Sequence, residues 1–247
     1  KQEESKPKQE EAKSKQEEAK LKQEEVKSKQ EEVKEESGDI INLSSFQSSD
    51  DFQSESEVNQ EEREEIYQKA VNLEKSSDVS GAAKLYKESA KMGDAESMLH
   101  YASMLQEGRG VPVDEEKAAK YLKEAANKGN PKAMYEYASF LTKSKDKVPH
   151  SSQIAAHFYK MAADLGNVEA MYQYGMILRN GEGVPIDKKE ALKYFKMATD
   201  KEHLDSMFCY AMMLKTGEGV PADKNEAIKY LKMATDKEHV DSMYNYA

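Results

Sequence analysis

Apolar side chains recur along residues 61–247 at a spacing that fits one helical hairpin per repeat. Five methionines are separated by 36, 37, 36 and 36 residues, and five tyrosines follow three positions later with the same steps. Self-similarity at such a period is the signature of a stacked repeat array. The methionines are Met98, Met134, Met171, Met207 and Met243, and the tyrosines are Tyr101, Tyr137, Tyr174, Tyr210 and Tyr246.

Within residues 94–129 the apolar pattern predicts two helices joined by a turn. The first has apolar residues around most of its circumference, so we expect it to be contacted on several sides. The second is rich in alanine, which lets helices approach closely. The positions that carry this pattern are Met98, Tyr101, Ala102, Met104 and Leu105 in the first helix, and Ala118, Ala119, Tyr121, Leu122, Ala125 and Ala126 in the second.

The turn between the two helices has the pattern Gly-x-Gly-Val-Pro, at residues 108–112, 181–185 and 217–221. Glycine ends a helix readily because it adopts the left-handed conformation at little cost. An aspartate follows each turn and is expected to cap the second helix. Asp187 with Glu190, and Asp223 with Glu226, have the spacing of a capping box.

These signals divide the repeat region into a polar capping unit at 61–93, four full repeats, and a partial unit at 239–247. The full repeats are 94–129, 130–166, 167–202 and 203–238.

Two departures from the pattern stand out. Residues 143–149 replace the Gly-x-Gly turn and carry three lysines, which makes this loop a candidate landmark for a specific contact. The glycine that closes the earlier repeats is replaced by Glu202 and Glu238. Because a left-handed glutamate costs about 1–2 kcal/mol, we expect a different turn geometry there.

The pattern resembles the Sel-one-like repeat family, a relative of the tetratricopeptide repeats. The resemblance covers about residues 61–247 and implies an all-α fold, an α/α superhelical solenoid in which antiparallel helix pairs form a right-handed superhelix. Its most specific element is Gly-x-Gly-Val-Pro-x-Asp. In one repeat the complete family pattern is carried by three groups of residues. They are Ala170, Tyr174, Gly175 and Leu178, then Gly181, Gly183, Val184 and Asp187, then Ala191, Tyr194, Ala198 and Thr199.

The N-terminal quarter of the chain follows different patterns. Residues 1–36 contain a Lys/Glu-rich seven-residue repeat with mostly one apolar position per heptad, whereas a coiled coil needs two. This segment is either a solvated helical spacer or a weak coiled-coil seam for a partner helix. Residues 37–60 are rich in Ser, Asp and Gln, which indicates a flexible linker. Isolated apolar residues within it leave open a docking motif.

Composition narrows the functional classes. The net charge is −10 and no basic stripe is present, which argues against nucleic acid as a partner. A single cysteine, Cys209, cannot form an internal disulfide, so we expect a reducing, cytoplasmic compartment. No apolar run is long enough to span a membrane. Because the chain starts at Lys1 and stops within a repeat, we expect it to be part of a longer polypeptide.

The sequence offers no catalytic residues, no metal ligands and no cofactor site. The five histidines have no metal-binding spacing, and Cys209 has no nucleophile signature, so it is expected to be a small, partly buried side chain. The Gly-x-Gly turns follow a helix and lack the lysine of a phosphate loop. We therefore expect a protein that is not an enzyme.

The remaining candidate is a partner-binding surface on the first helices, which are expected to line the concave side. Aromatic residues and methionines are adaptable contact residues. The same residues are also explained as packing between repeats, because periodic apolar residues belong to the core more often than to a binding surface. The candidates are Leu99, Tyr135, Tyr172, Phe208 and Tyr244, with Met176 and Met212 one turn further along their helices.

The sequence thus predicts a protein–protein interaction scaffold or adaptor that binds a partner segment on its concave face. Two alternatives stay open at this point. The array is either a structural element of a large assembly or the repeat region of a larger signalling enzyme, such as a kinase, whose catalytic domain lies outside this chain.

Overall fold

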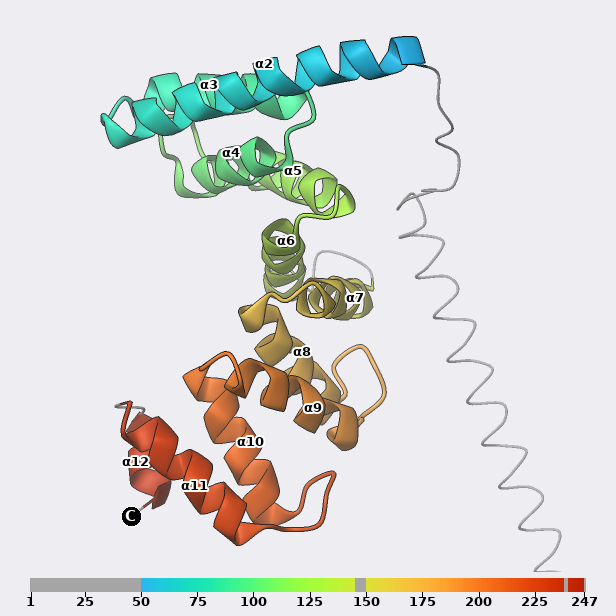
Figure 1. Cartoon of the computed structure of the whole chain (residues 1–247), viewed down its shortest axis with the longest axis vertical. Coiled ribbons are helices and arrows are strands. Elements are labelled where there is room, and N and C mark those ends of the chain that lie inside the picture. Colours follow the sequence, from blue (N-terminus) through green and yellow to red (C-terminus); the bar gives the residue numbers. More distant parts are fainter. Residues whose placement is uncertain (1–49, 145–149, 238–239, 247) are drawn as a thin grey trace, which may run out of the picture. The chain divides into compact units, whose positions relative to one another are not determined.

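The computed structural model describes residues 50–144, 150–237 and 240–246 (Figure 1), and every structural statement below refers to these. The expected spacer at 1–36, the centre of the lysine loop at 145–149, and Glu238 lie outside the described residues. All regular elements in the described ranges are helices. They are α2 (Asp50–Lys75), α3 (Val79–Lys91), α4 (Ala95–Glu107), α5 (Glu115–Asn127), α6 (Pro131–Lys143), α7 (Ser151–Asp164), α8 (Val168–Asn180), α9 (Lys188–Thr199), α10 (Leu204–Thr216), α11 (Lys224–Thr235) and α12 (Val240–Tyr246).

The helices pack as successive hairpins. Each first helix (α2, α4, α6, α8, α10) contacts the second helix that follows it, and each second helix contacts the first helix of the next hairpin. Helices α4 and α6 also touch each other directly. This arrangement confirms the predicted all-α array of helix–turn–helix repeats. Within the described residues, none of the helices has the length and apolar character needed to cross a membrane.

Helix α2 begins earlier than the sequence pattern indicated. It starts at Asp50, so the expected linker at 37–60 does not extend through residues 50–60. The polar composition of this stretch favoured a linker. Residues 50–75 contain neither glycine nor proline, however, so no helix-breaking residue interrupts the helix that packs on α3.

The core is built from the periodic residues. Met98, Met134, Met171 and Met207 are at most 4% exposed, so this column packs inside the array. The tyrosine three positions later meets a ring of the second helix edge-on in each of four hairpins, an arrangement that contributes about 0.5–1.5 kcal/mol beyond buried area. The pairs are Tyr101–Tyr121, Tyr137–Phe158, Tyr174–Tyr194 and Tyr210–Tyr230, with ring centroids 4.8–5.2 Å apart.

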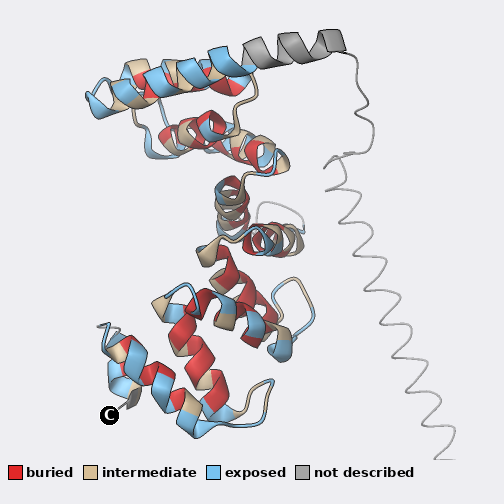
Figure 2. Ribbon diagram, viewed as in Figure 1, coloured by how far each residue is buried: buried red, intermediate tan, exposed pale blue. Residues whose placement is uncertain are grey.

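The first helices are enclosed as their sequences predict. In α10 seven of the thirteen residues are buried and they cover more than one side of the helix, whereas the second helices keep an exposed outer face (Figure 2). Each of α4, α6, α8 and α10 contacts both its own partner and the second helix of the preceding hairpin.

The second glycine of each Gly-x-Gly turn presses against the preceding repeat. A Cβ added at Gly110, Gly183 or Gly219 would lie 2.5–2.6 Å from backbone atoms at the start of α3, α7 or α9, respectively. These glycines also have positive φ angles, between 70° and 80°. Both the close approach and the left-handed backbone therefore require glycine at this position.

The predicted capping boxes are only half formed. The Asp187 side chain accepts a hydrogen bond from the Glu190 amide at 2.9 Å, and Asp223 does the same with Glu226. The reciprocal bond to the Glu190 side chain is replaced, because the Asp187 amide donates to the Leu178 carbonyl at 2.9 Å. The turn thus folds back onto the end of the first helix.

The expectation of a different turn at Glu202 is wrong. Glu202 has a φ of 65°, in the same left-handed region as Gly166 at 95°. Its amide donates to Thr199 at 2.9 Å, and the next amide donates to Ala198 at 3.1 Å. The turn at Gly166 makes the same two bonds. These two hydrogen bonds fix the backbone conformation of the turn, so Glu202 adopts the left-handed conformation despite its steric cost.

We predict that Gly183→Ala destabilises the array more than Gly166→Ala. Both positions have positive φ, which costs about 1 kcal/mol for alanine. A Cβ at Gly166 meets nothing within 4 Å, whereas at Gly183 it meets the Ser152 backbone at 2.6 Å. The clash should add about 1–3 kcal/mol to the loss in free energy of unfolding, measured by urea denaturation. Equal losses would contradict the stacking role of this glycine.

We also predict that Glu202→Gly stabilises the chain by about 1 kcal/mol, because it removes the left-handed strain. The measurement is the urea midpoint at constant slope. The reverse substitution, Gly166→Glu, is the matched control and should destabilise by a similar amount. The Glu202 carboxylate lies 2.8 Å from the Lys237 ammonium. A neutral or destabilising Glu202→Gly would show that this ion pair offsets the strain.

Candidate partner-binding surface

Three cavities open along the first helices, which supply most of their lining. The Glu74 cavity, of about 330 Å³, lies between α4 and α6. The Ser139 cavity, of about 450 Å³, shares Gln106 and Glu136 with it. The Tyr172 cavity, of about 240 Å³, lies where α8 meets α6 and α7. The cavities therefore follow the face on which the sequence placed the candidate contacts.

The seven candidate residues differ widely in exposure. Leu99 is 6% exposed and Tyr244 is 87% exposed, whereas the other five are half-buried. Leu99 serves as a wall of the Glu74 cavity and offers little surface of its own. Only Tyr172 and Met176 come together, in the lining of the Tyr172 cavity. Tyr135, Phe208, Met212 and Tyr244 line none of the three cavities.

The half-buried tyrosines are held from one side by their own repeats. The Tyr135 ring lies 5.8 Å from the Tyr159 ring, and the Tyr172 ring lies 6.1 Å from Phe195 and 5.1 Å from His203. Burial raises the pKa of both phenols above the ordinary value. The aromatic column is thus partly packing and partly surface, which combines the two explanations that the sequence left open.

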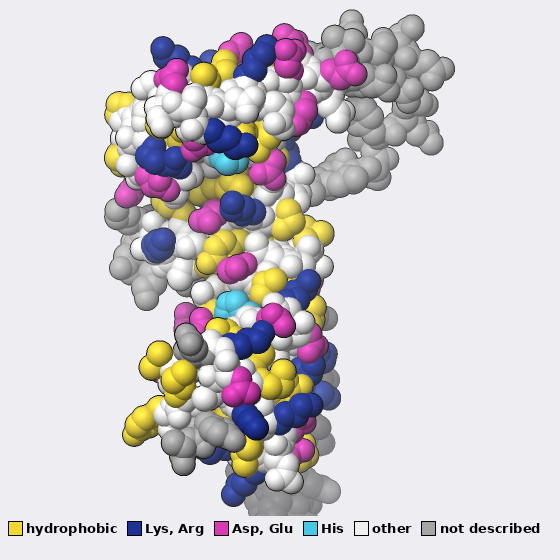
Figure 3. Space-filling view, turned by 60° about the vertical axis from the view of Figure 1, so that its left-hand side comes forward, with side chains coloured by type: hydrophobic (Ala, Val, Ile, Leu, Met, Phe, Trp, Pro, Cys, Tyr) yellow, Lys and Arg dark blue, Asp and Glu magenta, His cyan; other side chains and the backbone are white. Residues whose placement is uncertain are grey.

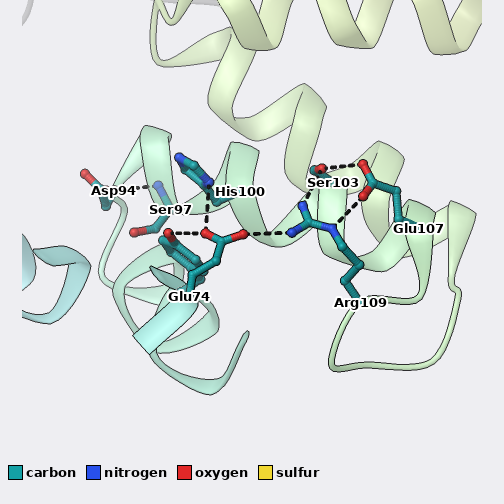
Figure 4. A network of polar contacts seen from close by, with 8 residues as sticks. Glu74, Asp94, Ser97, His100, Ser103, Glu107 and Arg109 are labelled. Carbon is teal, nitrogen blue, oxygen red and sulfur yellow. Dashed lines mark hydrogen bonds and ion pairs between the residues drawn. The ribbon is translucent and has the colours of Figure 1, made fainter. Parts of the chain in front are cut away.

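A polar network that sequence reasoning missed joins the capping unit to the next turn (Figure 4). Arg109, the middle residue of its Gly-x-Gly turn, donates to Glu74 on α2 at 2.7 Å and to Glu107 at 2.5 Å. Tyr86 also donates to Glu74, at 2.9 Å. Its ring stacks on His100 with 4.8 Å between centroids.

The network sets the charge state of Glu74. Burial alone would raise the pKa of this carboxyl, but the hydrogen bonds from Arg109 and Tyr86 bring it below the ordinary value. Burial lowers the pKa of His100, against the attraction of Glu74. The arrangement is therefore a structural ion pair between adjacent repeats, with His100 as a neutral stacking partner.

The same position is used with opposite polarity later in the chain. Arg179, in the last turn of α8, donates to Glu218 in the Gly-x-Gly turn of the next repeat, after α10, at 3.2 and 3.3 Å. The Lys188 ammonium lies 3.3 Å from the same carboxylate. Hydrogen bonding from Arg179 lowers the pKa of Glu218. Both pairs have the same signal in the sequence. The middle residue of the Gly-x-Gly turn is charged, and a residue of opposite charge lies near the end of the first helix in the repeat before it.

The single cysteine does not have the environment of a reactive thiol. Cys209 is buried, as its expected small packing role requires, and burial raises the pKa of its thiol to about 11. At neutral pH the thiol is therefore protonated and a poor nucleophile. In the described parts of the chain, no three His, Cys, Asp or Glu side chains are grouped as metal ligands.

Charges and apolar groups are interspersed on the surface. On the face drawn in Figure 3, small groups of hydrophobic side chains lie between acidic and basic ones. Such a mixed surface suits recognition of a segment that has both apolar and polar side chains.

Comparison with known proteins identifies the repeat. The family model described as Sel1 repeat matches residues 66–94, 95–130, 131–167, 168–203 and 204–239. Its four later ranges start one residue after the repeats read from the sequence. No curated protein matches the chain.

Several solved structures share the fold, and two of them illustrate the similarity to this chain. One is the protective antigen c5321 of uropathogenic Escherichia coli, which displays an SLR fold, with a TM-score of 0.71 and 19% identity over 76% of this chain. This chain covers 41% of that protein's length. The other is a Sel1 repeat protein from Oxalobacter formigenes, with a TM-score of 0.65 and 24% identity over 73% of this chain and 75% of that one.

We predict that Glu74→Gln destabilises the chain at pH 7 by about 1 kcal/mol, a modest value because the Arg109 side chain is 41% exposed. Since the folded-state pKa of Glu74 is lowered, its stabilisation is complete above the unfolded pKa of about 4.3 and is lost as pH falls through the folded pKa. The difference from the wild type should therefore vanish in acid.

Chemical denaturation at a series of pH values measures this effect. The control is Glu61→Gln, which removes an exposed carboxylate from the same helix. A Glu74→Gln difference that is independent of pH would contradict the ion-pair explanation.

Proposed function

Because the chain belongs to the Sel1 repeat family, we propose that it is a non-enzymatic scaffold or adaptor that binds a segment of a partner protein along its first helices. Sel1 repeat proteins generally mediate protein–protein interaction and are generally non-catalytic. The concave-face site, its residues and the adaptor role are the parts that we propose for this chain.

The observation that carries the proposal is the position of the cavities. All three lie along first helices, and the Tyr172 cavity combines a half-buried aromatic ring with a half-buried methionine. Methionine adapts its shape to a ligand, and aromatic rings supply large contact areas at low entropic cost. This surface supports binding of an extended or helical segment.

Variation between repeats supports a specific partner. The position one turn after the aromatic column is Ser103, Ser139, Met176 and Met212 in successive repeats, whereas the core methionines do not change. The core position must keep its volume in every repeat. The surface position has no such constraint, so it can differ along the array to match a partner without internal symmetry.

The test is selection of peptides from a random display library against the full chain. We predict that selected peptides lose at least tenfold in affinity for Met176→Lys, because the substitution places a charge inside the Tyr172 cavity. Affinities are measured by fluorescence anisotropy.

The matched control is Met197→Lys on α9, where the methionine is 42% exposed and lines none of the three cavities. This variant should bind as the wild type does. Peptides that bind both variants equally, or that lose affinity only for Met197→Lys, would contradict the first-helix surface.

A further inference from the structure

We propose that the Tyr172 cavity receives an arginine side chain of the partner and that Glu182 pairs with its guanidinium group. The inference rests on the proposed function, since the arginine belongs to a segment lying on the first helices. It adds the chemistry that this segment must present.

Comparison of equivalent positions within the chain supports this chemistry. The middle residues of the Gly-x-Gly turns are Arg109, Glu182 and Glu218. The first pairs with Glu74 on the preceding first helix at 2.7 Å, and the last pairs with Arg179 at 3.2 Å. In both junctions a carboxylate and a guanidinium close the gap between repeats, whichever side carries the acid.

At the remaining Gly-x-Gly turn, which contains Glu182, the preceding repeat offers no arginine. Thr142 holds the helix position that corresponds to Glu74 and Arg179, and its hydroxyl donates to the Ala138 carbonyl of its own helix at 2.9 Å. Glu182 accepts a hydrogen bond from the Asn180 amide group at 3.0 Å. Among residues 50–144, 150–237 and 240–246, no basic side chain forms an ion pair with Glu182. Thr142 and Glu182 instead face the same open cavity.

The walls of the cavity suit a guanidinium better than other groups. Glu182 is the only charged residue in the lining, beside the Tyr159 and Tyr172 rings and the Met176 side chain. A guanidinium is planar, stacks on aromatic faces and forms two parallel hydrogen bonds with a carboxylate. A neutral apolar side chain would desolvate Glu182 without replacing its hydrogen bonds, and an acidic one would be repelled.

The experiment uses the full chain with labelled methionine methyl groups, observed by NMR. The probes are N-acetyl-arginine amide and its neutral isostere N-acetyl-citrulline amide. We expect the Met176 methyl to shift on titration with the arginine probe, and the citrulline probe to bind at least tenfold more weakly. Glu182→Gln should weaken arginine binding at least tenfold.

Two further variants sharpen the test. Thr142→Arg supplies the missing guanidinium from within the chain and should abolish the Met176 shift. Glu169→Gln removes an exposed carboxylate from α8 outside the cavity lining, and it should bind the probe as the wild type does. Should Thr142→Arg not fold, Glu182→Gln alone decides, since its side chain is exposed.

Equal binding of the two probes, unchanged binding to Glu182→Gln, or no Met176 shift up to the solubility limit of the arginine probe would overturn the inference. If any of these occurs while selected peptides still depend on Met176, only the arginine chemistry fails and the proposed scaffold stands. If selected peptides ignore Met176 as well, both fail together.

Discussion

The contact on which the array depends is a close approach of backbone to backbone. The second glycine of each Gly-x-Gly turn lies against the first residues of the preceding repeat's second helix, where no Cβ fits. This contact sets the spacing and orientation of neighbouring hairpins without using a side chain. It also fixes the middle residue of the turn above the end of the preceding first helix. The ion pairs and the Tyr172 cavity all follow from that placement.

The fixed placement brings the middle residue of each Gly-x-Gly turn close to the end of the first helix of the preceding repeat. A charged side chain at one of these positions can therefore pair with an opposite charge at the other. Glu74 with Arg109 and Arg179 with Glu218 form such pairs with reversed polarity. The reversal shows that the backbone contact does not specify which charge is on which side. At both of these junctions the pKa of the carboxyl is lowered by its arginine partner.

The period of the array was predictable because it depends on the volume of the buried side chains and on the glycines that end the helices. Buried methionines and edge-on tyrosine pairs need the same side chain in every repeat, and this need is visible as a regular spacing. The left-handed Glu202 was not predictable, because the hydrogen bonds that its own amide and the His203 amide donate to Thr199 and Ala198 outweigh its conformational preference. The ion pairs were also missed, since they join residues 35 and 39 positions apart (74 to 109 and 179 to 218) that meet only after stacking. The candidate surface was only partly predicted, because an aromatic residue that recurs in every repeat can pack between helices, be exposed on the surface, or do both.

These constraints divide the positions of one repeat by what they are free to do. The core methionine, the edge-on tyrosine and the second glycine are fixed by packing, so they carry no information about a partner. The end of the first helix and the middle of the turn are fixed in place but not in chemistry. At two junctions, side chains of the chain itself form an ion pair at these two positions. At the junction of Thr142 and Glu182 it leaves a carboxylate beside an aromatic cavity.

An array stabilised mainly by its backbone contacts and core can leave one such junction open at small cost, since an exposed ion pair contributes only about 0–1 kcal/mol. The open junction is therefore where the fold has most freedom to recognise another molecule.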